Sequence, residues 1–174
     1  MRNVIGLAAI ASFLLSLSAL LQAQASPDAT PATPVFRAPV TVTVQTNHGE
    51  YKEQFEKVPY VAENNVYIFA GESFGVNVTI TGSEISQVTY QPDISKADVT
   101  FKFNQNKAMM MMMIQNKTKR RLFLDALMAV PEKKGMFRTS VVPIEPGTSS
   151  FEAWPHAIIQ LVLKNFRFSE KPAS

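Results

Sequence analysis

The feature that most constrains this chain is a series of short segments in which apolar and polar residues alternate. Val40–Val44 (VTVTV) and Phe74–Thr81 (FGVNVTIT) are the clearest of them, and Val99–Phe103 (VTFKF) has the same period of two. Such alternation turns successive side chains to opposite faces and is typical of half-buried β-strands. Turn-forming residues, including Asn47-His48-Gly49 and Gly82-Ser83, separate the segments. The chain is therefore predicted to consist mainly of strands.

Further strand-like segments follow one another at spacings of about 10 residues, as in all-β domains. They are Val66–Phe69, Ile85–Tyr90, Met109–Ile114, Leu122–Val130, Met136–Val142 and Ile158–Phe168. Tyr51–Lys57 fits a short helix or a strand. Many short strands and almost no helix predict an immunoglobulin-like antiparallel β-sandwich, with a β-barrel as the alternative.

The most unusual segment is a run of methionines, Met109–Met113, that leads into Ile114. An apolar run of this length between polar residues favours a strand over a helix. Alternation would then divide the run between two faces. One face would carry Met109, Met111 and Met113, and the other Met110, Met112 and Ile114.

Two interpretations of these methionines remain open. Methionine is flexible and fills gaps in a core. Thioethers also bind soft metals, and Met109, Met111 and Met113 could hold Cu(I) or Ag(I), with His156 or His48 as an added ligand. Apart from copper in this alternative, no cofactor is expected.

A basic run follows the methionines and consists of Lys117, Lys119, Arg120 and Arg121. We expect Ala108–Met128 to form the central hairpin of the sandwich, with this run at its turn. The cations either keep the turn hydrated and protect a sheet edge, or contact anionic material of the cell envelope. No interleaved aromatic residues of the kind that single-strand binders use are present, so nucleic acid is not an expected partner.

Two stretches resemble bacterial secreted immunoglobulin-like domains. Met112–Ile114, Asn116-Lys117-Thr118 and Leu122–Ala126 are similar to a strand, N-K-T/S turn and strand of such domains, and Ser149–Pro155 before a last long strand fits the same pattern. The resemblance covers at most the C-terminal half. It implies a fold and no catalytic residues, because a fold does not determine a function.

The chain is expected to divide into a signal peptide over 1–25, a Pro/Ala/Thr-rich linker over 26–39, the sandwich over 40–169 and a disordered tail over 170–174. Arg2, the apolar Val4–Leu21 and Ala23-Gln24-Ala25 match the parts of a cleaved secretory signal. The chain has no cysteine. For an exported protein this favours a bacterial periplasm. After signal cleavage no membrane-spanning segment is expected.

The sequence contains few residues that suggest catalysis. Only Glu145 and Glu152, which flank a Pro/Gly/Ser-rich loop, suggest a weaker alternative, a glycoside hydrolase acting on envelope sugars. Phe151, Trp154 and His156 cluster after that loop and are candidates for partner binding. A single Trp in a sandwich is otherwise a core residue.

These observations together predict an exported, non-enzymatic domain. The predicted partner is another envelope protein or a component of the cell envelope. The predicted contact residues are Lys117, Lys119, Arg120, Arg121, Phe151, Trp154 and His156.

Overall fold

A computed structural model describes residues 33–107 and 109–169. The regular secondary structure of this part consists of strands and one 3₁₀ turn, η1 (Ile94–Lys96). The predicted signal peptide and the tail lie outside the described residues. Among the described residues no helix is long and apolar enough to span a membrane.

The strands are β1 (Val40–Thr46), β2 (Gly49–Phe55), β3 (Val61–Ala62), β4 (Asn65–Phe69), β5 (Ser73–Thr81), β6 (Glu84–Gln91), β7 (Val99–Asn106), β8 (Met109–Asn116), β9 (Leu122–Ala129), β10 (Phe137–Thr139), β11 (Ser149–Trp154) and β12 (Gln160–Phe168).

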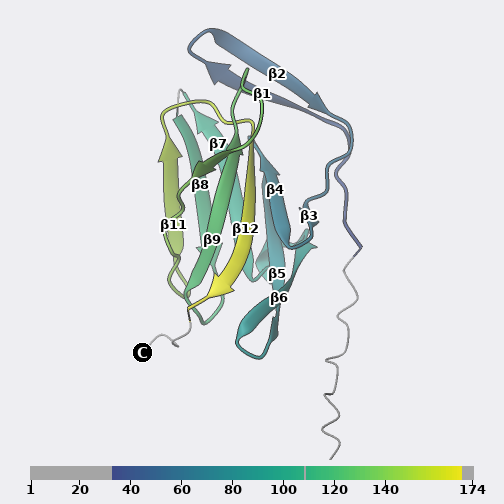
Figure 1. The fold of residues 1–174 in the computed structure, drawn as a ribbon, viewed down its shortest axis with the longest axis vertical. Coiled ribbons are helices and arrows are strands. Elements are labelled where there is room, and N and C mark those ends of the chain that lie inside the picture. The colour runs from purple at the N-terminus through teal and green to yellow at the C-terminus, as the bar shows by residue number, and fades with distance from the viewer. Residues whose placement is uncertain (1–32, 108, 170–174) are drawn as a thin grey trace, which may run out of the picture. The chain divides into compact units, whose positions relative to one another are not determined.

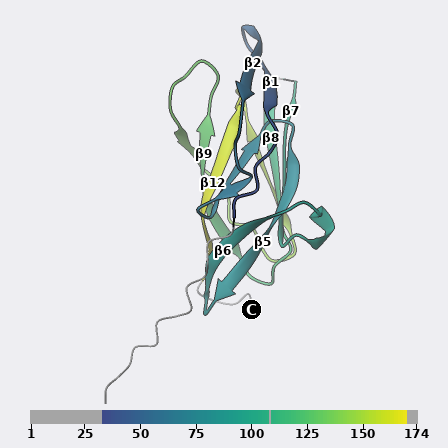
Figure 2. The same ribbon diagram turned by 90° about the vertical axis from the view of Figure 1, so that its right-hand side faces the viewer.

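Ten of these strands form two antiparallel five-stranded sheets that pack face to face (Figures 1 and 2). One sheet has the order β10-β9-β12-β4-β3, and the other has the order β11-β8-β7-β5-β6. The sheets remain separate, so the predicted sandwich is confirmed and the barrel alternative is wrong. β2 shows that the ambiguous Tyr51–Lys57 segment is mainly a strand.

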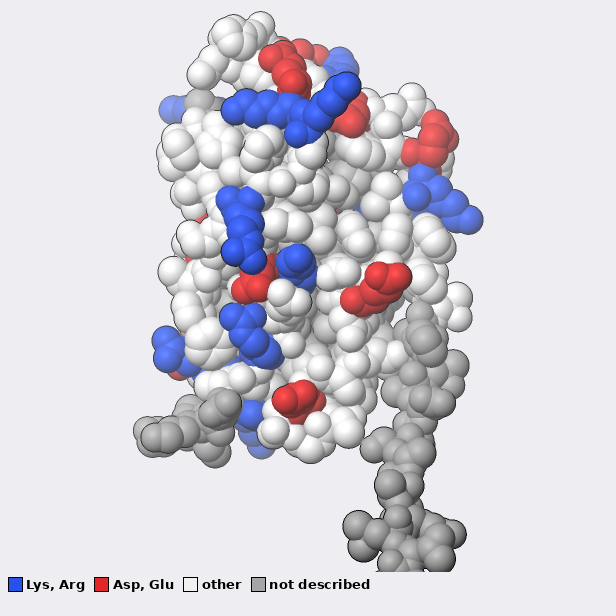
Figure 3. All heavy atoms as spheres, in the orientation of Figure 1, with Lys and Arg blue, Asp and Glu red and all other residues white. Residues whose placement is uncertain are grey.

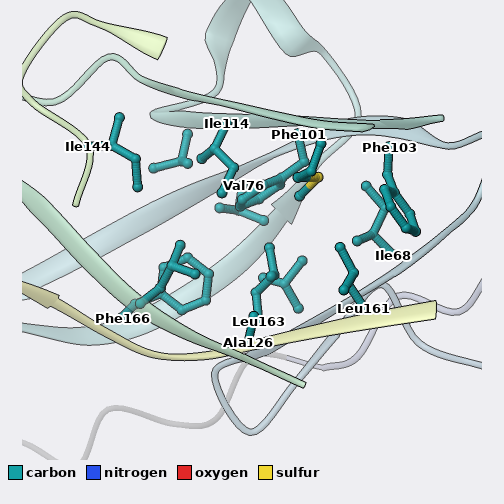
Figure 4. Packing of buried hydrophobic residues seen from close by; sticks show 14 of the residues in the cluster. Ile68, Val76, Phe101, Phe103, Ile114, Ala126, Ile144, Leu161, Leu163 and Phe166 are labelled. Carbon is teal, nitrogen blue, oxygen red and sulfur yellow. The ribbon is translucent and has the colours of Figure 1, made fainter. Parts of the chain in front are cut away.

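The core fills the space between the sheets and follows the alternation seen in the sequence (Figure 4). In β12, Leu161 and Leu163 are buried while Val162 and Lys164 are only half-buried. Apolar area removed from water contributes about 25 cal/mol per Å², so this inward row is the main stabilising element of β12. The largest fully buried side chains are Phe69, Phe101, Phe103, Ile68, Met110, Met112, Ile114, Leu122, Ile144, Ile158, Leu161 and Leu163.

β1 and β2 form a separate hairpin that covers one end of the sandwich (Figure 1). Val42 and Val44 point inward and share a second apolar cluster with Phe69. The side chain of Gln105 also binds the hairpin: its Oε1 accepts from the Gln45 N–H at 2.7 Å, and its Nε2 donates to the Gln45 carbonyl at 2.7 Å. This amide therefore pairs with the hairpin backbone as a neighbouring strand would.

The described end of the predicted linker packs on the domain. Arg37 is buried, and its guanidinium donates to both carboxylate oxygens of Glu72 at 2.8 and 3.1 Å. Its remaining donors bind the carbonyls of Val58, Pro59 and Tyr67. All five donors of this side chain are thus satisfied. Arg37 therefore belongs to the packed domain, although the composition around it is that of a linker.

The expected central hairpin over Ala108–Met128 is wrong. β8 pairs with β7 and β11, whereas β9 pairs with β10 and β12, so the two strands lie in different sheets. The connection between them is organised by Asn116, which is completely buried. Its Nδ2 donates to the carbonyls of Arg120 and Ile144 at 2.8 and 3.0 Å, and its Oδ1 accepts from Thr118 N–H at 3.0 Å. The Asn-Lys-Thr sequence is therefore a crossover between sheets.

Candidate functional site

β8 divides its methionines as the alternation predicts. Met110 and Met112 are buried in the core with Ile114. Met109 and Met111 point outward and are 47% and 40% exposed, and Met113 on the same face is half-buried. The core interpretation therefore holds for one half of the run, and the other half lies on the outer face of an inner strand.

Phe151 extends this apolar surface onto the neighbouring strand. In the β11–β8 pairing Phe151 lies directly opposite Met113, and Ala153 lies opposite Met111. Phe151 is 69% exposed, although an aromatic ring contributes most when it is buried. We name Met109, Met111, Met113 and Phe151 the Met–Phe face. It gathers large apolar side chains from two strands that are far apart in the sequence.

A groove of about 760 Å³ adjoins the Met–Phe face. Met111, Met113 and Phe151 line one part of it, and polar side chains of β7 line another. Lys102 is the only charged residue among the lining residues that the structure describes. It lies opposite Met113 in the β7–β8 pairing. The groove therefore combines apolar walls with a single positive charge.

One free edge of this sheet, β6, is partly protected by side-chain hydrogen bonds. On β6 the side chain of Asn64 accepts from Val88 N–H at 2.9 Å and donates to the Ser86 carbonyl at 3.2 Å. On β11 the Glu152 carboxylate accepts from Val142 N–H at 2.8 Å. The Asn64 contacts occupy backbone groups of β6 and so oppose the pairing of another strand along that edge. The Glu152 contact ties the segment after β10 to β11.

Most of the basic run is used within the domain. Lys117 Nζ donates to the Ile94 carbonyl at 2.6 Å, and Arg121 forms a 2.8 Å ion pair with Glu145 at the surface. Arg120 donates to the Ser83 carbonyl at 2.7 Å and lies over a phenyl ring of β12. Lys119 has no hydrogen bond or ion pair with any residue that the structure describes. Three of the four cations of the run therefore have partners among the described residues.

The other predicted site residues lie in different surroundings. Trp154 is 8% exposed, packs edge-on against Phe103, and donates from Nε1 to Thr139 Oγ1 at 2.7 Å. It is a core residue, as one of the two interpretations expected. His156 is exposed and lines a depression of about 320 Å³ together with His48.

No metal centre of the usual ligand types is present within residues 33–107 and 109–169: no three His, Asp or Glu side chains there are grouped to hold an ion. Glu145 and Glu152, the candidate carboxylates for hydrolysis, are engaged with Arg121 and with Val142 N–H respectively.

Sequence reasoning missed Lys102 and the strand β11. Lys102 belongs to an alternating strand and gives no signal of its own. Its position could be recognised only once β7 was placed next to the methionines.

Comparisons with protein-family models, with curated proteins and with solved structures find no match to this chain.

Proposed function

We propose that the chain is an exported, non-enzymatic binding domain that engages another protein of the cell envelope through the Met–Phe face. The observation that carries the proposal is the exposure of Phe151 beside Met109, Met111 and Met113 on the outer face of a sheet. Large apolar side chains gathered on a surface are characteristic of interaction sites. Methionine and aromatic residues are enriched in such contacts.

The charge of the groove indicates the chemistry of the partner. Lys102 is the single charged group among the described lining residues, and it adjoins apolar walls. The partner is therefore a protein segment that places apolar side chains on Met111 and Phe151 and a carboxylate near Lys102. Flexible methionines allow this surface to adapt to the shape of that segment.

Site-specific photo-crosslinking tests this proposal in the compartment where the protein resides. A photoreactive amino acid replaces Phe151 in the test variant. In the control variants the same photoreactive amino acid replaces Ile80 or Val142, which are also exposed but lie outside the groove lining. We expect a discrete adduct from position 151 that is lost when Met111→Ser is added. The protein captured in this adduct is then purified, and it should bind the isolated domain more weakly when the domain carries Lys102→Glu. Equal adducts from the control positions, or none from position 151, would contradict the proposal.

A second candidate function is the binding of Cu(I) or Ag(I) by the same methionines. It is favoured by one observation: three thioether side chains lie on the outward face of one strand rather than in the core. Residues two apart on a strand are separated by about 6.6 Å, so flexible side chains can bring neighbouring sulfurs toward one ion. Lys102 on the adjoining strand opposes a cation there by charge repulsion.

Two triple variants distinguish the candidates. Met109, Met111 and Met113 changed together to Leu keep an apolar face and remove the sulfurs, whereas the same residues changed to Ser remove both. Protein binding should survive the Leu triple and be lost in the Ser triple. Cu(I) binding, measured by competition with a chromogenic chelator under reducing conditions, should be lost in both. Metal binding that survives the Leu triple would exclude these residues as ligands.

A further inference from the structure

The opposite sheet carries a group of cations that come from separate strands. Arg138 lies on β10, and Lys164 and Arg167 lie on β12. Together with Asp125 of β9 they line a groove of about 300 Å³. Figure 3 shows the face over β9 and β12, where Lys and Arg side chains form a band with acidic side chains among them. We name Arg138, Lys164, Arg167 and Asp125 the basic groove.

The strand register explains why these residues meet. Lys164 lies directly opposite Asp125 in the β9–β12 pairing, and Arg138 lies opposite Leu127, two residues further along β9. Residues two apart on a strand point to the same face. Arg167 comes next to Asp125 because the ladder shifts register between Lys164 and Arg167. Asn165 within this irregularity has a positive φ of 55°.

Only one of the three cations, Arg167, forms a hydrogen bond or ion pair with the carboxylate. Asp125 accepts from Arg167 at 3.3 Å and from Asn165 Nδ2 at 2.7 Å. Arg138 and Lys164 have no hydrogen bond or ion pair with any described residue. Lys164 is nonetheless half-buried. The groove therefore has two unpaired positive charges, and bringing like charges together costs free energy that a bound anion would offset.

The pKa of Asp125 agrees with this positive environment. The hydrogen bond from Asn165 and the charges of Arg167 and Arg138 hold the pKa of that carboxyl below its usual range, while burial opposes them. Asp125 thus stays ionised and holds Arg167 in place. Because Arg167 is already paired with this carboxylate, the anionic group of a ligand would bind to Arg138 and Lys164.

We propose that the basic groove binds a phosphate monoester group. Such a group carries about 1.5 to 2 negative charges near neutral pH, which matches the two unpaired cations. Its oxygens suit an Arg guanidinium, which binds phosphate in a bidentate manner, and the Lys ammonium supplies a second point of attachment. Ser140 also lines the groove and offers a hydroxyl donor. The group comes either from a soluble phosphate ester or from a lipid headgroup.

A titration with two probes tests the proposal and distinguishes these sources. Glycerol 3-phosphate is added to the ¹⁵N-labelled domain at constant ionic strength, and vesicles of phosphatidylcholine with phosphatidic acid are tested by co-sedimentation. The test variant is Arg138→Gln with Lys164→Gln. The matched control is Lys119→Gln with Lys134→Gln, which removes the same net charge from exposed lysines outside the groove.

We expect saturable binding of at least one probe, with amide shifts confined to β9, β10 and β12. The groove variant should bind about tenfold more weakly or worse, because hydrogen bonds to charged groups are lost. The control should bind as the unmodified protein does. Binding of the soluble ester assigns a free ligand, and binding of the vesicles alone assigns a lipid headgroup. Saturable binding of neither probe, or an equal loss in both double variants, overturns the proposal.

Discussion

Arg37 Nε lies 2.8 Å from Glu72 Oε1, and this pair joins the start of the described chain to the loop between β4 and β5. The guanidinium also lies over the rings of Tyr60 and Phe69, at 4.2 and 4.8 Å from their centres. Its charge is buried, and it is compensated by one carboxylate and a set of backbone carbonyls. The residue thus holds in place an N-terminal segment whose own apolar side chains, Val35 and Phe36, stay largely exposed.

Removing Arg37 should destabilise the domain strongly. We expect Arg37→Met to reduce the free energy of unfolding by about 3 kcal/mol, because it leaves the Glu72 carboxylate without its partner in a largely buried site. Urea unfolding followed by fluorescence measures the change. Adding Glu72→Gln should recover part of the loss, whereas Lys52→Met, which removes an exposed ion pair with Glu50, should have almost no effect.

Asn116 should tolerate neither a shorter nor a charged side chain. Asn116→Ala leaves buried carbonyls without a donor, at a cost of about 1–3 kcal/mol. Asn116→Asp should cost more, because it places a carboxylate against the carbonyls of Arg120 and Ile144. Thermal unfolding by circular dichroism ranks the variants, with Asn106→Asp at an exposed position as the control. A more stable Asp variant than Ala variant would contradict the assigned orientation of the amide.

Substitutions of Gly75 and Ala97 should have strongly coupled effects on the stability of the domain. A Cβ on Gly75 would overlap with the Cβ of Ala97, which is buried beneath it. Gly75→Ala should therefore cost about 1–3 kcal/mol of stability through overpacking. Adding Ala97→Gly should relieve most of that loss. A double-mutant cycle measured by chemical denaturation gives the coupling, and strictly additive effects would show that the two residues do not meet.

The methionines should separate into two classes. Met112→Ala, in the core, should cost about 2–5 kcal/mol. Met111→Ala, on the exposed face, should change stability by no more than about 0.5 kcal/mol. Brief treatment with peroxide, analysed by peptide mass spectrometry, should oxidise Met109 and Met111 before Met110 and Met112, because oxidation follows exposure. Uniform oxidation along the run in the folded protein would contradict the division of faces.

Asp125 should make a measurable contribution to acid sensitivity. Its folded pKa lies below the ordinary value, so ionised Asp125 stabilises the native state. This contribution is fully present above the unfolded pKa of about 3.9 and is lost as the pH falls through the lower folded value. Asp125→Asn should therefore flatten the decline in urea midpoint below about pH 4. Glu84→Gln, at an exposed site, controls for the loss of one charge.

The strands were predictable wherever alternation and burial coincide. Val42 and Val44 point inward as the pattern of β1 predicts, and Leu161 and Leu163 do the same in β12. β11 was missed because its pattern is inverted: Ser150 is buried and Phe151 is exposed. A rule that places apolar residues inside cannot recognise such a strand.

The errors concern contacts between segments that are distant in the sequence. The turn residues after β8 suggested a hairpin, but the buried amide of Asn116 binds the distant Ile144 carbonyl and directs the chain to the other sheet. The basic run was the obvious charge signal, whereas Arg138 and Lys164 become neighbours only through β9. Local sequence therefore indicated most of the strands, and the pairing of strands determined the candidate sites.

The crossover at Asn116 also determines how the protein should be produced. Asn116-Lys117-Thr118 matches the acceptor sequence for N-linked glycosylation in a eukaryotic secretory pathway. The nitrogen that would carry the sugar is the same Nδ2 that binds buried carbonyls between the sheets. A chain glycosylated there before folding would have no room for the sugar and would lose the donor that organises the crossover. Bacterial expression, or Thr118→Ala in a eukaryotic host, avoids this modification.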